Sequence, residues 1–285
     1  MLLVVDSGST KADWAFCSPD GTVHMESSLG VNPNVHSTAE ITTVLESVCP
    51  VEVPEAKVTH IHYYGTGIWD AKRGQKIKEV LQAIYVRADI EVHHDLLGAA
   101  RAACQAEPGI ACILGTGSNT CLYDGSKVTD NVKNLGWLLG DEGSGVDIGK
   151  RLVRAYCYRE LPREVESLFE ESTGHNRKSI GDSLYGPSHA NRFLASFSPF
   201  VHDNLDVPEI RQLVVEAFTE FLRRHVMKYR GYESLKVSFV GSIAHHYDEV
   251  LREVCAAHDI TCGGIRQKPI DPLVEFHRRQ HSLTA

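Results

Sequence analysis

The sequence has no long hydrophobic run, no excess of basic residues and no CxxC motif. Its first apolar run, residues 1–5, ends at Asp6 and is too short for a signal peptide or a membrane-spanning helix. The chain has 29 Lys+Arg against 37 Asp+Glu, a net charge of −8, so it offers no basic field to nucleic acid or anionic lipid. We therefore expect a cytoplasmic protein with no nucleic-acid or membrane partner.

The eight cysteines are scattered along the chain. In a sequence of this size without an export signal, such cysteines are typical of buried thiols in a reducing compartment. The histidine pairs do not predict a metal site either. His93 and His94, like His245 and His246, are adjacent and would face opposite ways on a strand, and His60 and His62 have no obvious third ligand nearby.

The 285 residues, 42% of them hydrophobic and 23% charged, suffice for two globular domains. A polar break at Glu107-Pro108-Gly109 predicts the boundary between domains 1–107 and 108–285. The tail, residues 270–285, has a helical pattern, and we expect it to pack back on the first domain.

Each predicted domain begins with the same pattern of strands and turns. An apolar strand, a Gly/Ser turn, a second strand, an Asp-Gly turn and a third strand follow one another in residues 2–28 and again in residues 109–130. With an offset of 109, Gly8 aligns with Gly117 and Ser9 with Ser118. Helical and strand patterns then alternate, which predicts parallel pairing. We interpret the chain as an internally duplicated α/β protein.

Four apolar segments end in turns of small residues, which allow backbone N–H groups to approach an anion closely. These turns are DSGST (6–10), GTGSN (115–119), GDEGSG (140–145) and VGSIA (240–244). Any one of them can be an ordinary hairpin or strand-helix turn. None matches GxxxxGK[ST], and no strand precedes an intact GxGxxG, so neither a P-loop nor a dinucleotide-binding fold is expected.

In order, DSGSTK, HHDLLGA, LGTGSN, GWLLGDEGSG and FVGSIA resemble the superfamily of sugar kinases, heat-shock ATPases and actin. The combination is most similar to N-acetylglucosamine kinase and the related BadF/BadG-type ATPase family. This resemblance implies two ribonuclease H-like domains in an actin-like ATPase fold, with Mg-ATP and an amino sugar in the interdomain cleft. It also implies transfer of phosphate from ATP to the 6-hydroxyl of N-acetylglucosamine, and a homodimer.

The resemblance implies a role for each matching residue. Asp95 would be the catalytic base, and Asp6 would hold Mg²⁺. Nucleotide binding is expected of Asp6, Gly8, Ser9, Thr10, Lys11, Thr116, Gly117, Gly241 and Ser242. Sugar binding is expected of Asn34, Asp95, Ser118, Asn119, Trp137, Asp141 and Glu142.

Each role has a structural alternative. Asp95 can cap the following helix, Asp6 can cap a turn, and Lys11 can be a solvated turn lysine. Trp137 can be an aromatic of the interdomain core, and Asn34 can shape a turn. Two other functions stay open as well: an ATP-driven activator acting on a protein partner, although no cluster-binding cysteine pair is evident, and a non-catalytic sugar sensor.

Overall fold

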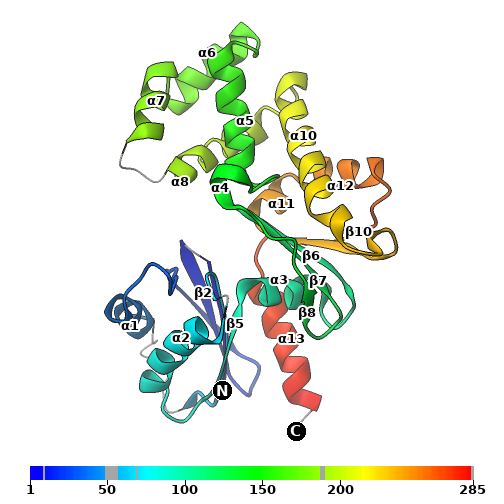
Figure 1. The fold of residues 1–285 in the computed structure, drawn as a ribbon. Helices are drawn as coiled ribbons and strands as arrows, with labels where there is room; N and C mark the ends of the chain where they lie inside the picture. The colour runs from blue at the N-terminus through cyan, green and yellow to red at the C-terminus, as the bar shows by residue number, and fades with distance from the viewer. Residues whose placement is uncertain (9, 49–56, 69, 187–189, 284–285) are drawn as a thin grey trace. The chain divides into compact units, whose positions relative to one another are not determined.

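The computed structural model describes residues 1–8, 10–48, 57–68, 70–186 and 190–283. Residues 281–283 are described by their backbone only. The chain forms two compact units (Figure 1). Unit 1 consists of residues 1–106 and 269–285, and unit 2 of residues 107–268. The domain ranges 1–107 and 108–285 remain an expectation from the sequence. In the structure the C-terminal segment from Pro269 belongs to unit 1.

Unit 1 is a five-stranded mixed sheet with helices on both faces. Its strands lie in the order β3-β2-β1-β4-β5, in which β1–β3 form an antiparallel meander and β1, β4 and β5 run parallel. The elements are β1 (Leu2–Ser7), β2 (Lys11–Cys17), β3 (Val23–Leu29), α1 (Thr38–Glu46), β4 (His60–Gly65), α2 (Ala71–Ile84), β5 (Asp89–His94), α3 (Asp95–Cys104) and α13 (Ile270–Leu283).

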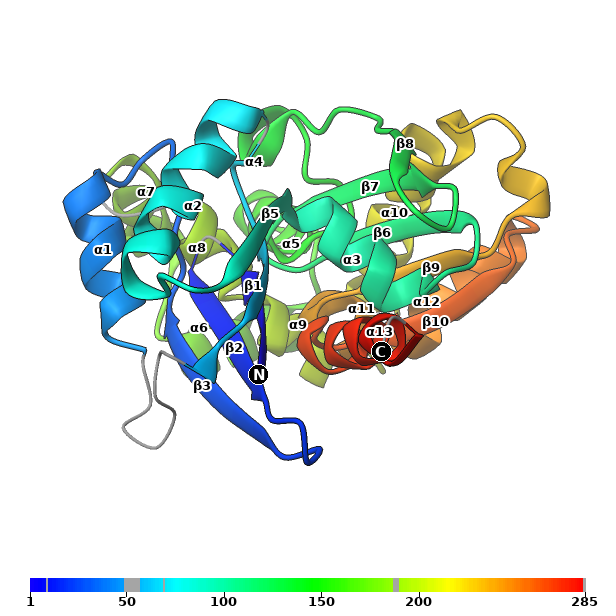
Figure 2. The same cartoon turned by 90° about the horizontal axis from the view of Figure 1, so that it is seen from below.

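Alternation along the strands of unit 1 sends side chains to two separate layers. Leu3 and Val5 of β1 are buried in one core with Ile41 of α1 and Ile77 of α2. Figure 2 shows α1 and α2 side by side next to the strands. Helices α3 and α13 pack together on the remaining face, where both contact β1. The tail helix is therefore part of the support beneath the first strand of unit 1.

Unit 2 repeats the same sheet and adds a helical region. Its strands lie in the order β10-β9-β6-β7-β8, with β6–β8 antiparallel and β6, β9 and β10 parallel. The strands are β6 (Gly109–Leu114), β7 (Ser118–Tyr123), β8 (Val128–Asp130), β9 (Val237–Val240) and β10 (Cys262–Arg266). The helices are α4 (Gly136–Leu139), α5 (Gly145–Tyr158), α6 (Arg163–Thr173), α7 (Arg177–Tyr185), α8 (Ala190–Ala195), α9 (Ser198–Asp203), α10 (Pro208–Arg224), α11 (Ser242–His246) and α12 (Asp248–Ala257), with short 3₁₀ turns at Val226–Lys228 and Tyr232–Ser234.

The two sheets have one topology, because β6, β7, β8, β9 and β10 correspond in order and direction to β1, β2, β3, β4 and β5. The predicted α/β class, with a meander followed by parallel strands in each half, is confirmed. No helix in the described ranges is long and apolar enough to cross a membrane.

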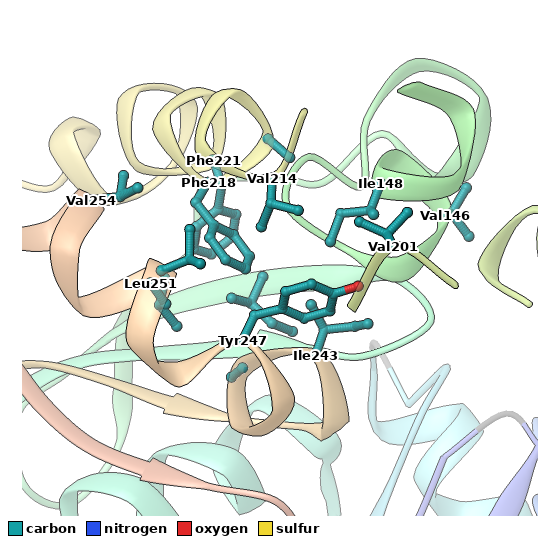
Figure 3. Close-up of a cluster of buried hydrophobic side chains, with 14 of the residues drawn as sticks. Val146, Ile148, Val201, Val214, Phe218, Phe221, Ile243, Tyr247, Leu251 and Val254 are labelled. Atoms are coloured by element: carbon teal, nitrogen blue, oxygen red, sulfur yellow. The ribbon is translucent and has the colours of Figure 1, made fainter. Parts of the chain in front are cut away.

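The core of unit 2 joins its long helices to the sheet (Figure 3). Phe218 and Val214 of α10 point toward Leu251 of α12, and Ile243 and Tyr247 lie below them. All five side chains are nearly or fully buried. This packing holds α11, which begins at the Gly-Ser turn after β9, against α12 and the sheet.

Helix α5 approaches α8 so closely that only glycine fits at one position. A Cβ atom on Gly149 would lie 2.0 Å from the carbonyl oxygen of Leu194, whereas a Cβ atom on Gly181 of α7 would meet nothing within 4 Å. We expect Gly149→Ala to lower the free energy of unfolding by about 1–3 kcal/mol through overpacking. Gly181→Ala should raise it by about 0.5–1 kcal/mol, because glycine is a poor helix former.

Urea denaturation followed by circular dichroism measures both changes. Equal stability of the two variants would contradict the packing of α5 on α8.

Candidate functional site

Three carboxyl groups gather at one end of the unit 1 sheet. Asp6 lies near the end of β1, and the hairpin register places Asp13 of β2 opposite it. Asp95 follows the parallel strand β5, and its charge acts on Asp6. Parallel strands end at the same edge of a sheet, which explains how residues 6 and 95 come together.

Burial and like charge act together on Asp6. Burial raises the pKa of Asp6 to about 7, and the charges of Asp95 and Asp13 contribute to the same increase. Lys11 forms an ion pair with Asp13, at 2.8 Å from Nζ to Oδ1, but its own side chain is half exposed. Asp6 lies within the strand and not at a turn, so the turn-capping alternative does not describe its position.

Asp95 is the first residue of α3 and not its cap. His94 takes that place, since its Nδ1 accepts the N–H of Leu96 at 3.0 Å. The same Nδ1 lies 2.7 Å from Oδ1 of Asp95. The helix-capping alternative for Asp95 is therefore wrong, and the carboxyl group stands at the end of the sheet beside His94.

The small-residue turn of unit 1 is a tight hairpin. The N–H of Gly8 donates to the carbonyl of Lys11 at 3.0 Å, and the N–H of Gly30 donates to the carbonyl of Thr10 at 3.0 Å. Thr10 and Lys11 are exposed at this turn. Ser9, which the sequence also assigns to nucleotide binding, lies outside the described residues.

A single carboxyl group ties two of the unit 2 turns together. Oδ1 of Asp141 accepts the N–H of Ser118 at 3.0 Å and the side-chain amide of Asn134 at 2.7 Å. Asp141 has a φ of 59°, in the left-handed region. The hydroxyl of Ser118 is buried and has no hydrogen-bond partner among the residues the structure describes. GTGSN and GDEGSG thus form one polar site. The sequence analysis assigned residues of both segments to the sugar but did not predict this hydrogen bond between them.

The nucleotide-binding residues predicted in unit 2 also converge. The carbonyls of Gly115 and Thr116 accept the first N–H groups of α5, at 2.9 and 3.1 Å. Gly241 has a φ of 129°, and a Cβ there would lie 2.1 Å from the carbonyl oxygen of Leu114. The Gly241-Ser242 turn therefore lies against the strand that leads into Thr116 and Gly117.

The remaining predicted sugar-binding residues make other contacts. Asn34 uses its amide to hold a turn, donating to the carbonyl of Gly67 at 2.9 Å and accepting from Arg73. Asn119 accepts the side-chain amide of Asn131 at 3.1 Å. Trp137 lies on the short helix α4 with 39% of its surface exposed, so it is not a core aromatic of unit 2.

Glu142 points to α10 and not to the Asp141 network. Its carboxyl lies 3.0 Å from Nε2 of the buried His225 and 3.5 Å from Nε of Arg224. The neighbouring turn is fixed by Asp147, which accepts the N–H of Gly143 at 3.1 Å and pairs with Arg151.

Three polar residues of these sites escaped the sequence analysis: Asn134, Asp13 and His94. Asp13 had a usable signal, because a tight β1–β2 hairpin pairs it with Asp6. His94 was seen only as half of a histidine pair. Asn134 had no motif of its own, since its role depends on a loop closing over Ser118.

The chemistry of the unit 1 cluster suits a hydrated divalent cation. Carboxylate oxygens are preferred ligands of Mg²⁺, which keeps several waters and is held by one or two carboxylates plus substrate phosphates. Within the described ranges, no group of three His, Cys, Asp or Glu side chains forms a metal cage. The residues therefore fit a cation held mainly by Asp6 through water.

The family model described as the BadF/BadG/BcrA/BcrD ATPase family matches residues 3–256. The chain belongs to this family. The expectation of a BadF/BadG-type ATPase is thus confirmed, and the motifs that carried it all lie within the matched region. No curated protein matches the chain significantly.

Solved structures agree with this assignment. A Porphyromonas gingivalis protein named as a candidate N-acetylglucosamine kinase is 37% identical and has a TM-score of 0.94, with 99% of this chain and 100% of that chain covered. A second candidate N-acetylglucosamine kinase, from Chromobacterium violaceum, is 18% identical with a TM-score of 0.65, covering 96% and 98%. MamK bound to AMPPNP is 12% identical with a TM-score of 0.53, covering 98% of each chain. The last two similarities concern the fold, and the expected actin-like ATPase fold is confirmed.

The raised pKa of Asp6 predicts that the free energy of unfolding of this BadF-family protein falls as the pH rises. An acid whose folded pKa lies above its unfolded value loses stability as the pH rises between the two values. For Asp6 this range runs from about pH 4 to about pH 7. Asp6→Asn cannot ionise, so its free energy of unfolding relative to wild type should increase across that range, by at most about 1.4 kcal/mol for each pH unit.

Urea titrations at pH 4 and pH 8 in a chelator measure this difference. Added Mg²⁺ at pH 8 should narrow it, because the cation favours the ionised wild-type carboxyl. A difference independent of pH would contradict the electrostatic account of the cluster.

Proposed function

We propose that this protein transfers the terminal phosphate of ATP to the 6-hydroxyl of N-acetylglucosamine. Membership of an ATPase family supports the use of ATP. The similarity over nearly the whole chain to a protein named as a candidate N-acetylglucosamine kinase supports the amino sugar as acceptor. The observation that carries the proposal is the Asp95 carboxyl, which lies beside Asp6 and does not cap its helix.

In this proposal Asp95 accepts the proton of the sugar hydroxyl as the oxygen attacks phosphorus. Oδ1 of Asp95 lies 2.7 Å from Nδ1 of His94, and Oδ2 is the carboxyl oxygen assigned to the acceptor hydroxyl. Alignment of the reactants and neutralisation of charge supply most of the acceleration in phosphoryl transfer, and the base contributes a smaller part.

Asp6 would hold Mg²⁺ through water, and the cation would offset the negative charge of the transferred phosphate. Because the pKa of Asp6 is raised, a cation would compete with a proton for this carboxyl near neutral pH. The Gly8–Lys11 turn in unit 1 is assigned to the phosphates. In unit 2, Thr116 and Gly117 are assigned to the phosphates and the Gly241-Ser242 turn to the adenosine.

Ser118 and Asp141 are the proposed centre of amino-sugar recognition. The buried hydroxyl of Ser118 favours a ligand that can hydrogen-bond it, because an unsatisfied buried hydroxyl costs free energy. One oxygen of Asp141 already accepts two hydrogen bonds, which orients the other toward a ligand hydroxyl. Asn119 and Trp137 are also assigned to the sugar, whereas Glu142 and Asn34 are assigned to holding their own turns.

We expect Asp95→Asn to lower kcat by about 10²–10⁴-fold, since it removes the general base but keeps the shape of the side chain. ATP affinity should change little. Asp89→Asn, at the exposed opposite end of β5, is the matched control and should retain kcat. The assay measures ADP release with N-acetylglucosamine, and phosphorus NMR identifies the phosphorylated hydroxyl.

Unchanged turnover in Asp95→Asn would remove Asp95 as the base. ADP release that is equal with and without every tested N-acetylhexosamine would instead favour the ATP-driven activator.

A further inference from the structure

Two cysteines of unit 2 lie side by side next to an arginine, although six residues separate them in sequence. Cys255 is fully buried near the end of α12, and Cys262 begins the edge strand β10 and is partly exposed. Arg252 of α12 contacts the sulfur of Cys262, and Cys255 lies one turn further along the same face of that helix, which packs on β10. The two cysteines have no role in the nucleotide or sugar sites proposed above.

The end of α12 explains how the chain brings the two thiols together. The carbonyl of Cys255 accepts the N–H groups of His258 and Ile260, at 3.1 and 2.9 Å. Asp259 has a φ of 55°, so the backbone reverses in a left-handed turn. The chain then enters β10, where the carbonyl of Thr261 accepts the N–H of Val237 at 2.9 Å. Both ends of the turn are thus fixed by backbone hydrogen bonds.

Arg252 supplies a positive charge to the exposed member of the pair. It lies one helical turn before Cys255, and its NH1 is 3.7 Å from Sγ of Cys262. Asp248 forms an ion pair with Arg252 on the same helix. A guanidinium beside a partly exposed sulfur favours the thiolate, which is the nucleophilic form of cysteine.

The titration of the pair agrees with this geometry. The hydrogen bond from the Cys255 thiol lowers the pKa of Cys262 to about 7, with burial opposing it and Arg252 adding to it, while the charge of Asp248 acts in the other direction. The pKa of Cys255 is raised, first by that hydrogen bond and then by burial and the neighbouring Cys112 on β6. Cys262 is therefore the sulfur that ionises near neutral pH, whereas Cys255 stays a thiol.

We propose that Cys262 and Cys255 are a hydroperoxide-reactive pair that closes to a reversible disulfide. The Cys262 thiolate attacks one oxygen of hydrogen peroxide, the O–O bond breaks, and Cys262 becomes a sulfenic acid as hydroxide leaves. The thiol of Cys255 then attacks the Cys262 sulfur, forming the S–S bond and releasing water, so that peroxide is reduced and both cysteines are oxidised. A dithiol reductant restores the two thiols.

The arrangement favours a disulfide over other uses of the pair. A disulfide joins sulfurs about 2 Å apart, and Cys262 lies on the strand that packs against α12, with its sulfur at the helix face that carries Arg252 and Cys255. A metal site is not supported, because no cluster of three potential ligands occurs in the described part of the chain. The buried position of Cys255 also shields the resolving thiol from direct oxidation.

Cys157 is the internal control. It is also partly exposed, on α5, but burial raises its pKa. At pH 7 we expect alkylation of Cys262 by iodoacetamide to be about tenfold faster than that of Cys157, because its larger thiolate fraction outweighs the lower intrinsic nucleophilicity of a low-pKa thiolate. The rate at Cys262 should rise with a midpoint near pH 7. Arg252→Met should move that midpoint upward and slow the reaction severalfold at pH 7.

Peroxide treatment of the full chain, followed by alkylation and peptide mass spectrometry, tests the second step. Wild type should yield a peptide linked through residues 255 and 262 that dithiothreitol separates. Cys255→Ser should accumulate a sulfenic acid at Cys262 that dimedone captures, and Cys262→Ser should leave Cys255 reduced.

Alkylation of wild-type Cys262 no faster than that of Cys157 would overturn the proposal without any variant. So would a peroxide-treated wild type that lacks the linked peptide. Both measurements are independent of ATP or sugar turnover, so they stand whether or not the proposed kinase activity is found.

Discussion

The burial of the Asp6 carboxyl, beside the charges of Asp95 and Asp13, is the constraint on which the unit 1 site depends. Parallel pairing of β1, β4 and β5 brings Asp6 and Asp95 to one edge of the sheet, and the β1–β2 hairpin adds Asp13. Lys11 pairs with Asp13 but is half exposed, so the positive charge near Asp6 is limited. The site therefore has little positive charge, which is the basis for the cation proposed to bind there.

The duplicated topology shows how the two units arrive at different chemistry from one framework. In the alignment that places Gly8 on Gly117, Asp6 falls on Gly115. Unit 1 carries a carboxyl group on the strand itself, whereas unit 2 has glycine there. In unit 2 the carboxyl group is that of Asp141, in the loop after β8, and it accepts the N–H of Ser118.

Sequence reasoning succeeded where the signal was local. Alternating apolar residues and Asp-Gly turns defined both meanders, and the order of the motifs identified the family. It left alternatives open where two neighbouring residues could make the same contact. Aspartate is a better N-cap than histidine by residue type, yet His94 caps α3. Asp95 is already the first residue of the helix, so its carboxyl does not occupy the capping position.

Contacts made by loops were also beyond prediction. Nothing in the sequence around Asn134 signals that its amide closes on Ser118 and Asp141, because that contact requires the whole loop after β8 to fold first. The pairing of Cys255 with Cys262 likewise depends on one left-handed residue, Asp259, a conformation that aspartate adopts only occasionally. The predicted thiols were found, but Cys104, Cys157 and Cys262 are partly exposed instead of buried, and Cys49 lies outside the described residues.

The two polar sites also differ in how they are held rigid, which bears on how each responds to a ligand. Asp141 keeps a left-handed backbone, which costs about 1 kcal/mol for a residue other than glycine, and two hydrogen bonds to its Oδ1 compensate for that cost. Its geometry is therefore set before any ligand arrives. Asp6 is fixed in position by its strand, but its protonation state changes near neutral pH. On the proposed assignments, a sugar hydroxyl would meet a preorganised partner in unit 2, whereas a cation in unit 1 would compete with a proton for Asp6 near neutral pH.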